Sequence, residues 1–322
     1  MRFLAVITRH LTIAIPVTML LGLIFGLSAP VGWLKSLIVP LTLLMVYPMM
    51  VNLNMRQLFE GGDTSAQLLA QAINFTVIPL AAYVLGRVWF PDQPFFALGL
   101  LLAALLPTSG MTIAWTGFAG GNVTAAIKMT VAGLILGSLA TPFYVQWLMG
   151  ATIPIDLAAV FAQIVLVVFV PMLAGQVTRH LLVRRFGAPG FKRDWAPRFA
   201  PLSTLGVLGI VFVAIALKAG DLAARPQILI TLLVPLLVLY GFNYAFSTVV
   251  ARLLLPRDDA IALVYGTVMR NLSIALAVAM NAFGEASADA ALLIALAYVI
   301  QVQSAAWYVR LGNRVFGPQP AG

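Results

Sequence analysis

Long apolar stretches follow one another along this chain, and they constrain its fold more than any motif does. We expect ten helical spans, at 8–28, 33–53, 65–89, 94–118, 122–149, 156–180, 200–218, 226–254, 258–283 and 287–311. At about 1.5 Å per residue, each can cross roughly 30 Å of hydrocarbon. Of the 322 residues, 62% are hydrophobic and only 9% are charged, which is too little charge to cover a soluble domain. The sequence therefore predicts an all-α polytopic membrane protein with a single transmembrane domain over residues 1–322.

The chain repeats itself at a fixed offset of 161 residues. At this offset residues 109–114 fall on 270–275, and the Pro-Leu pair at 40–41 falls on the Pro-Leu pair at 201–202. Two matches at one offset indicate an internal duplication, with repeat one at about 1–150 and repeat two at about 156–316. Five spans per repeat turn the second copy upside down, so we predict two inverted five-helix repeats. We expect the first span to be retained rather than cleaved as a signal peptide, since its loss would leave repeat one a helix short.

Each repeat interrupts one span with small polar residues. The fourth span is interrupted at residues 107–110 and the ninth at 269–271. Pro107 removes a backbone donor and Gly110 relaxes the backbone. Paired broken helices in inverted repeats are typical of transporters that bind substrate near the bilayer midplane. We expect the breaks of helices four and nine to cross there; a simple kink in each of two packing helices is the alternative.

The lysines and arginines are distributed unevenly between the two sides of the expected bundle. Thirteen share a side with both termini: Arg2, Arg9, Arg56, Arg179, Arg184, Arg185, Lys192, Arg193, Arg198, Arg252, Arg257, Arg310 and Arg314. The opposite side holds four, Lys35, Arg87, Lys218 and Arg225. This excess predicts a protein of the inner membrane with both termini in the cytoplasm. The longest and most basic segment, 181–199, is expected to be a cytoplasmic linker.

Two basic residues fall inside the spans. Arg270 lies about ten residues into the ninth span, roughly 15 Å deep. We expect no aspartate or glutamate at comparable depth, so its partner is a backbone carbonyl, water or an anionic substrate, and a structural brace at the crossing is the alternative. Lys128, in the fifth span, either reaches back to the lipid headgroups or points at the same crossing as a second fixed cation.

Short polar groups at the two breaks complete a candidate substrate site. Singly each is typical of helix capping, but together at one crossing they favour binding. The candidate substrate-binding residues are Thr108, Ser109, Gly110, Thr112, Arg270, Asn271 and Ser273. Five other polar residues inside spans, Asn74, Gln163, Asn243, Gln301 and Gln303, are expected to form interhelical hydrogen bonds.

Enzymatic chemistry has no residues to support it. His10 and His180 lie at span ends, cysteine is absent, and Asp258 with Asp259 lacks the further carboxylates of a diphosphate–magnesium site. We therefore expect no enzyme, resident cofactor or metal. The basic residues that give the net charge of +9 lie between spans, which favours membrane orientation over nucleic-acid binding.

Two stretches resemble the bile acid:sodium symporter superfamily. Residues 107–122, PTSGMTIAWTGFAGGN, are similar to its broken fourth helix, and residues 270–279, RNLSIALAVA, are similar to its ninth. The resemblance implies the ten-helix fold, transport of organic anions with sodium, and family polar positions retained at Thr130 and Asn271. Where sodium-coupled members carry a glutamate and a glutamine, this chain has Thr267 or Gly266 and Arg270, and the charge of Arg270 would repel sodium.

Within the superfamily the ninth helix is most similar to that of the arsenite-permease branch, which shares the Arg-Asn pair. That branch has a cysteine where Thr108 stands and a glutamate where Ser273 stands. Arsenite chemistry uses the cysteine thiolate and proton exchange uses the carboxylate. At these two positions this chain has neither group.

We therefore expect a secondary transporter of a small anionic solute that works by alternating access. Arg270, and Lys128 if it reaches the crossing, would be fixed cations in an ion site that includes Thr130 and Asn271. The alternatives are a sodium-coupled organic anion symporter of the bile-acid type and an efflux permease for arsenite or another metalloid. The resemblance also implies that spans four, five, nine and ten rock against spans one, two, six and seven.

Overall fold

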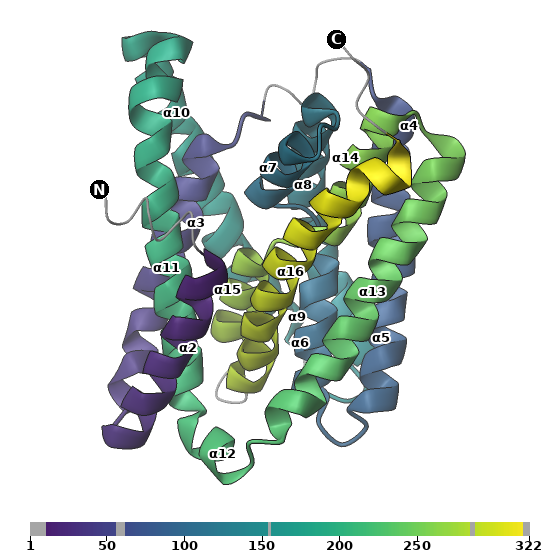
Figure 1. Ribbon diagram of the computed structural model, residues 1–322. Coiled ribbons are helices and arrows are strands. Elements are labelled where there is room, and N and C mark those ends of the chain that lie inside the picture. The colour runs from purple at the N-terminus through teal and green to yellow at the C-terminus, as the bar shows by residue number, and fades with distance from the viewer. Residues whose placement is uncertain (1–10, 56–61, 154–155, 284–286, 318–322) are drawn as a thin grey trace. The chain divides into compact units, whose positions relative to one another are not determined.

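A computed structural model describes residues 11–55, 62–153, 156–283 and 287–317 (Figure 1). Regular structure in these residues is helical, apart from one antiparallel bridge between Pro107 and Arg270. The prediction of an all-α fold is confirmed. Arg2, Arg9, Arg56 and His10, which entered the sequence analysis, lie outside the described residues.

The helices follow the expected spans closely. In chain order they are α2 (Leu11–Ser28), η1 (Gly32–Leu37), α3 (Ile38–Asn52), α4 (Thr64–Ala72), η3 (Ile73–Val77), α5 (Ile78–Trp89), α6 (Pro94–Leu105), α7 (Gly110–Phe118), α8 (Val123–Met149), α9 (Leu157–Ile164), η4 (Val165–Phe169), α10 (Val170–Gly190), η5 (Phe191–Trp195), α11 (Ala196–Leu217), α12 (Ala219–Ala224), α13 (Ile228–Leu254), α14 (Arg257–Val268), α15 (Leu272–Ala282) and α16 (Ser287–Phe316). η1 is a 3₁₀ turn, and η3, η4 and η5 are π-helical turns that continue the helices around them.

Six helical stretches of the described residues are long and apolar enough to cross a membrane. They are Gly32–Asn52, Thr64–Trp89, Val123–Met149, Leu157–Leu217, Ile228–Leu254 and Ala288–Gly312. Three shorter apolar helices, Ile13–Ser28, Pro94–Leu105 and Leu272–Ala282, accompany them. The protein is a multi-pass membrane protein, while the ten-span inverted repeat stays a prediction.

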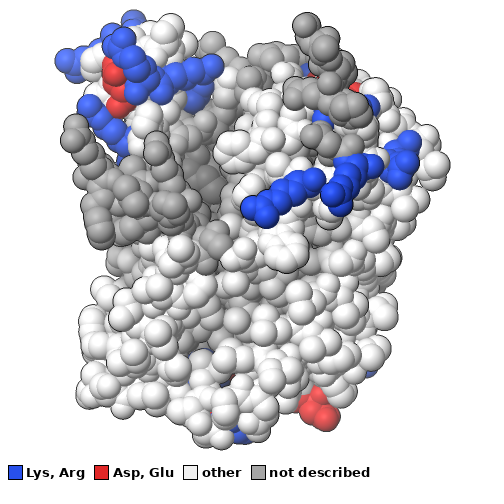
Figure 2. All heavy atoms as spheres, viewed as in Figure 1, with Lys and Arg blue, Asp and Glu red and all other residues white. Residues whose placement is uncertain are grey.

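The basic linker at 181–199 differs from the expected loop because it is helical. α10 continues to Gly190, and η5 and α11 follow without a gap. The chain changes direction at Gly187, where a φ of 73° is easily adopted by glycine alone. Lysines and arginines gather at this end of α10 (Figure 2). Among them, the guanidinium of Arg193 lies 2.9 Å from the carboxylate of Asp194.

The chain forms two compact units, and each contains segments of both expected repeats. Unit 1 comprises Met1–Leu53, Pro154–Thr231 and Ser273–Leu296, and unit 2 comprises Asn54–Ile153, Leu232–Leu272 and Ala297–Gly322. The helices of the expected spans one, two, six and seven therefore belong to unit 1. The two helix breaks, from Leu105 to Gly110 and from Val268 to Leu272, both belong to unit 2.

In unit 1 the helices pack closely because small residues lie at their contacts. α11 packs against α2 and α3, and α10 packs against α3. A Cβ added at Gly206 would come within 2.4 Å of the backbone nitrogen of Met45, so the two helices touch backbone to backbone there. At the end of α11, Lys218 pairs with Asp289 at 2.8 Å and with Asp221 at 3.2 Å.

In unit 2 the helix segments that flank the breaks pack against one another and against neighbouring helices. α14 packs against α4, α7 and α8, and α5 packs against α6. α16 lies beside α13 (Figure 1), where the rings of Tyr244 and Tyr308 stack at 4.7 Å. These contacts hold the breaks between packed helices rather than at a surface.

Candidate substrate site

The two helix breaks pair with each other. α6 ends at Leu105 and α7 begins at Gly110, while α14 ends at Val268 and α15 begins at Leu272. Between these ends the backbone N–H of Thr108 donates to the carbonyl of Met269 at 2.8 Å, and the N–H of Asn271 donates to the carbonyl of Leu106 at 2.8 Å. Backbone groups freed by a break inside a membrane protein must find partners. Here each break supplies them for the other.

The first break carries a strained residue that α8 accommodates. Thr108 is fully buried and has a φ of 61°, a left-handed conformation that is costly for a β-branched side chain. Its hydroxyl donates to the carbonyl of Pro107 at 2.7 Å and lies 3.3 Å from the carbonyl of Thr130. A Cβ at Gly133 would lie 2.6 Å from that hydroxyl, so glycine at this place in α8 lets the break approach.

Ser109 and Thr112 begin α7 as a capping box. The backbone N–H of Met111 donates to the Ser109 hydroxyl at 3.2 Å, and the N–H of Ser109 donates to the Thr112 hydroxyl at 3.1 Å. The hydroxyl of Thr130 donates within α8 to the carbonyl of Ala126 at 2.8 Å. These three candidate hydroxyls therefore already hold helix geometry.

The remaining small candidates lie on both sides of the unit boundary. Gly110 opens α7 with free space around the position of a Cβ. Asn271 is buried, with its backbone in the bridge to the first break. Ser273 is half-buried and belongs to the segment of α15 in unit 1. The structure thus brings Thr108, Ser109, Gly110, Thr112, Thr130, Arg270 and Asn271 into one unit.

Asparagines close the broken end of α14. Asn74, on the π-helical turn η3, donates to the carbonyl of Gly266 at 3.0 Å, and Asn243 on α13 donates to the carbonyl of Thr267 at 2.9 Å. The carbonyls at a helix end lack intrahelical partners, so these amides replace them. The expectation that Asn74 and Asn243 form interhelical hydrogen bonds is confirmed.

Gln301 on α16 holds the backbone of the second break. Its Oε1 accepts from the N–H of Arg270 at 2.8 Å, and its Nε2 donates to the carbonyl of Arg270 at 3.1 Å. The Tyr240 hydroxyl donates to the same Oε1 at 2.9 Å, which fixes the orientation of the amide. Gln301 also confirms the expected interhelical hydrogen bonding.

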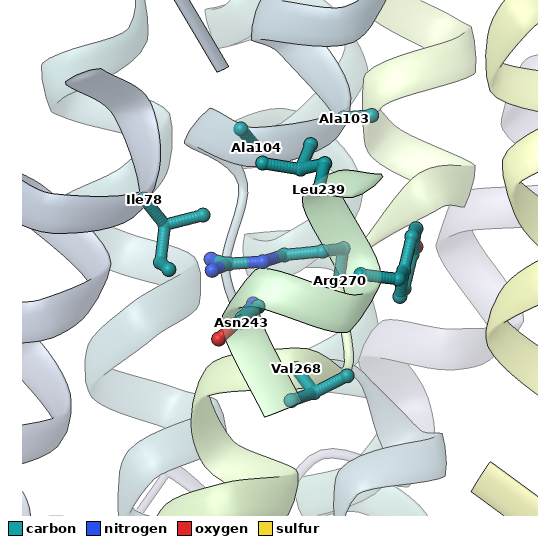
Figure 3. A pocket seen from close by; sticks show the side chains of 8 residues that line it. Ile78, Ala103, Ala104, Leu239, Asn243, Val268 and Arg270 are labelled. Carbon is teal, nitrogen blue, oxygen red and sulfur yellow. The ribbon is translucent and has the colours of Figure 1, made fainter. Parts of the chain in front are cut away.

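Arg270 directs its charge into a small cavity. The residue is 3% exposed, and neither terminal nitrogen, Nη1 or Nη2, has a hydrogen-bond partner among the described residues. Figure 3 shows the guanidinium extended from the break toward Ile78, beside Asn243. The cavity has a volume of about 10 Å³ and is lined by Ile78, Ala103, Ala104, Leu239, Tyr240, Asn243, Val268 and Arg270. A buried cation without a partner is costly, so the arrangement is typical of an anion site.

Lys128 has a partner that the sequence analysis missed. Its Nζ lies 3.0 Å from Oδ2 of Asp63, and the two side chains are 4% and 17% exposed. Asn122 caps α8 and donates from Nδ2 to Asp63 at 2.8 Å and to Asp259 at 2.7 Å. The sequence does contain a signal for Asp63, because an aspartate directly before Thr64 is typical of the N-cap position at the start of a helix. The charge of Lys128 is thus balanced close by.

Residues 39–225, more than half of the chain, match the sequence profile of the Sodium Bile acid symporter family. The chain belongs to this family. Its members are transporters rather than enzymes, and a secondary transporter is the function that membership supports.

The relatives that this chain resembles are named for different functions. The arsenical-resistance protein Acr3 of Corynebacterium glutamicum is 22% identical over 303 residues, which cover 86% of this chain and 82% of that protein. An uncharacterized sodium-dependent transporter of Bacillus subtilis, YocS, is 24% identical over 263 residues, 80% of this chain and 78% of that protein. Sodium/bile acid cotransporter 7 of Xenopus tropicalis is 21% identical over 225 residues, 65% and 62% of the two chains.

Proposed function

We propose that this protein carries a small anionic solute across the inner membrane by alternating access, and that Arg270 is the fixed cation that binds it. The guanidinium without a partner supports this proposal more than any other observation. Both terminal nitrogens of Arg270 are buried and unbonded among the described residues, in a cavity whose other lining residues are uncharged. An anion would supply the missing acceptors, and a guanidinium offers two parallel donors to it.

The positions that bind sodium in the family support a sodium-independent site. Thr267 or Gly266 stands where sodium-coupled members carry glutamate, and the hydroxyl of Thr267 is engaged with the carbonyl of Leu263 at 3.0 Å and with Ser247 at 2.7 Å. A sodium ion at this position would have no carboxylate ligand, and the positive charge of Arg270, just beyond the end of α14, would repel it. Lys128 already has Asp63 as a counter-ion, so we assign the anion to Arg270 alone.

We also propose two inverted five-helix repeats whose breaks cross near the bilayer midplane, with both termini in the cytoplasm. Thr108 and Met269 are equivalent at the offset of 161, and they are joined by a backbone hydrogen bond. The excess of lysine and arginine beside the termini supports the orientation. The two compact units would be the bodies that move during transport.

Thermal unfolding of the purified protein tests this function. Chloride, nitrate, acetate, phosphate and arsenite would each be added in sodium buffer and in potassium buffer, since a ligand of the folded state raises the unfolding midpoint. We expect a monovalent anion to raise the midpoint equally in both buffers. Arg270→Gln should weaken that anion roughly 10- to 100-fold, because a hydrogen bond to a charged group contributes about 1.5–3 kcal/mol. Arg310→Gln, at an exposed arginine, is the control and should bind normally.

Two other functions have a specific observation in their favour. The similarity to sodium-dependent relatives favours organic anion symport, which requires stabilisation that appears only in sodium buffer. The similarity to Acr3 over most of the chain favours arsenite export, which requires stabilisation by arsenite and resistance in a sensitive strain. If either result is obtained and Arg270→Gln binds the ligand as well as the unchanged protein does, the corresponding function replaces the proposal.

A further inference from the structure

An apolar groove runs along unit 2 between α5 and α13. Nine residues line it, all apolar: Val77, Leu80, Ala81, Val84, Leu85, Val88, Val238, Leu239 and Phe242. Its volume of about 550 Å³ lies in the range of small-molecule sites. Several lining side chains are open to the outside of the helices, with Val84 58% exposed and Val238 50% exposed. In a multi-pass protein a groove with this lining opens to the hydrocarbon of the bilayer.

The groove and the Arg270 cavity meet at one residue. Leu239 lines both of them and is only 5% exposed, so its side chain forms the wall between them. Where η3 continues into α5, Val77 lines the groove and the next residue, Ile78, lines the cavity. Figure 3 places Leu239 and Ile78 around the guanidinium of Arg270. The apolar groove thus ends at the wall of a cavity that holds a buried cation without a hydrogen-bond partner for its terminal nitrogens among the described residues.

We propose that the groove and the cavity form one site for a fatty acid that enters from the bilayer, with its carboxylate on Arg270 and its chain along α5 and α13. The proposal rests on the proposed anion site at Arg270 and names the class of its ligand. The two terminal nitrogens match the two oxygens of a carboxylate in a bidentate pair. A monoanion balances the single positive charge, whereas a dianion would leave a buried charge unbalanced. Rotation of Leu239 would join the two spaces.

The experiment is a chain-length series on the full protein in detergent. Acetate, butyrate, hexanoate, octanoate and decanoate would be compared with the alcohols of equal length, and Kd obtained from thermal stabilisation. Each methylene buried in the groove should lower Kd about fourfold, the equivalent of roughly 0.8 kcal/mol. Arg270→Gln should abolish the preference for the carboxylate over the alcohol of the same length.

Two matched substitutions test where the acyl chain of the fatty acid lies. Val84→Trp fills the groove and should remove most of the chain-length dependence. Val249→Trp, at a 57% exposed position of α13 that does not line the groove, should keep it. If acetate binds through Arg270 but longer chains gain no affinity, the groove is not part of the site and only the proposed function survives. If both tryptophan variants keep the full chain-length dependence, the acyl chain lies in detergent or annular lipid and the inference is wrong. If no carboxylate depends on Arg270, the inference fails, and the proposed function fails with it only when no inorganic anion depends on Arg270 either.

Discussion

Gln301 contacts both backbone polar groups of Arg270, accepting from its N–H at 2.8 Å and donating to its carbonyl at 3.1 Å. A side-chain amide has a donor and an acceptor side by side, so it can replace the backbone partner that a broken helix lacks. Gln301 is fully buried. The position of the Arg270 side chain therefore depends on a residue 31 positions away on α16.

We predict that Gln301→Leu destabilises the protein and weakens anion binding together. The substitution leaves a buried N–H and a buried carbonyl unsatisfied, at about 1–3 kcal/mol each. Chemical denaturation in detergent and the anion titration give the two readouts. Gln303→Leu, at an exposed glutamine on the same helix, should change neither. Full binding by Gln301→Leu would mean that Arg270 is positioned by other contacts.

Tyr240→Phe should have a smaller effect in the same direction. The hydroxyl orients the Gln301 amide by donating to Oε1 at 2.9 Å, while the ring stays in place in the variant. Loss of one buried hydrogen bond costs about 1 kcal/mol. In the double variant Tyr240→Phe with Gln301→Leu, the two losses should be less than additive, because both act on one network. Additive losses would show that the two residues act separately.

The two helix breaks were predictable from the sequence, but the contacts that hold them were not. Pro107 and Gly110 disrupt helix geometry by themselves, so the first break was predictable, and the position of Arg270 within an apolar span predicted its burial. The pairing of Lys128 with Asp63 joins residues 65 positions apart and depends on how α4 meets α8. The π-helical turn Ile73–Val77, which carries Asn74, has no sequence signal of comparable strength.

The linker was misjudged for a local reason. Its arginines indicated a surface segment, and a surface segment between two spans was expected to be a loop. Basic residues are good helix formers, however, so residues after His180 continue α10 as an exposed helix. Only Gly187 interrupts the helical conformation there. Charge predicted the exposure of this segment better than its conformation.

The Lys128–Asp63 pair predicts a strongly non-additive double-mutant cycle. Either Lys128→Met or Asp63→Asn leaves one partly buried charge without its partner, which costs about 3–5 kcal/mol. The double variant should lose less than the sum, with a coupling energy of about 1–3 kcal/mol in denaturant titrations. The exposed pair Arg193–Asp194 is the control, and its removal should leave stability unchanged. A cycle that closes additively would show that Lys128 is stabilised by other groups.

The contact between α11 and α3 predicts that unit 1 tolerates no side chain at Gly206. A Cβ there would lie 2.4 Å from the nitrogen and 2.5 Å from the Cα of Met45, and backbone atoms cannot rotate away as a side chain does. The helices must separate, so Gly206→Ala should cost about 1–3 kcal/mol of unfolding free energy and lower the yield of folded protein. Gly241→Ala on α13 meets nothing within 4 Å and, by removing a flexible residue from a helix interior, should be neutral or stabilising. Equal stability of the two variants would show that α11 and α3 do not pack this closely, and that the small residues of unit 1 serve a different purpose.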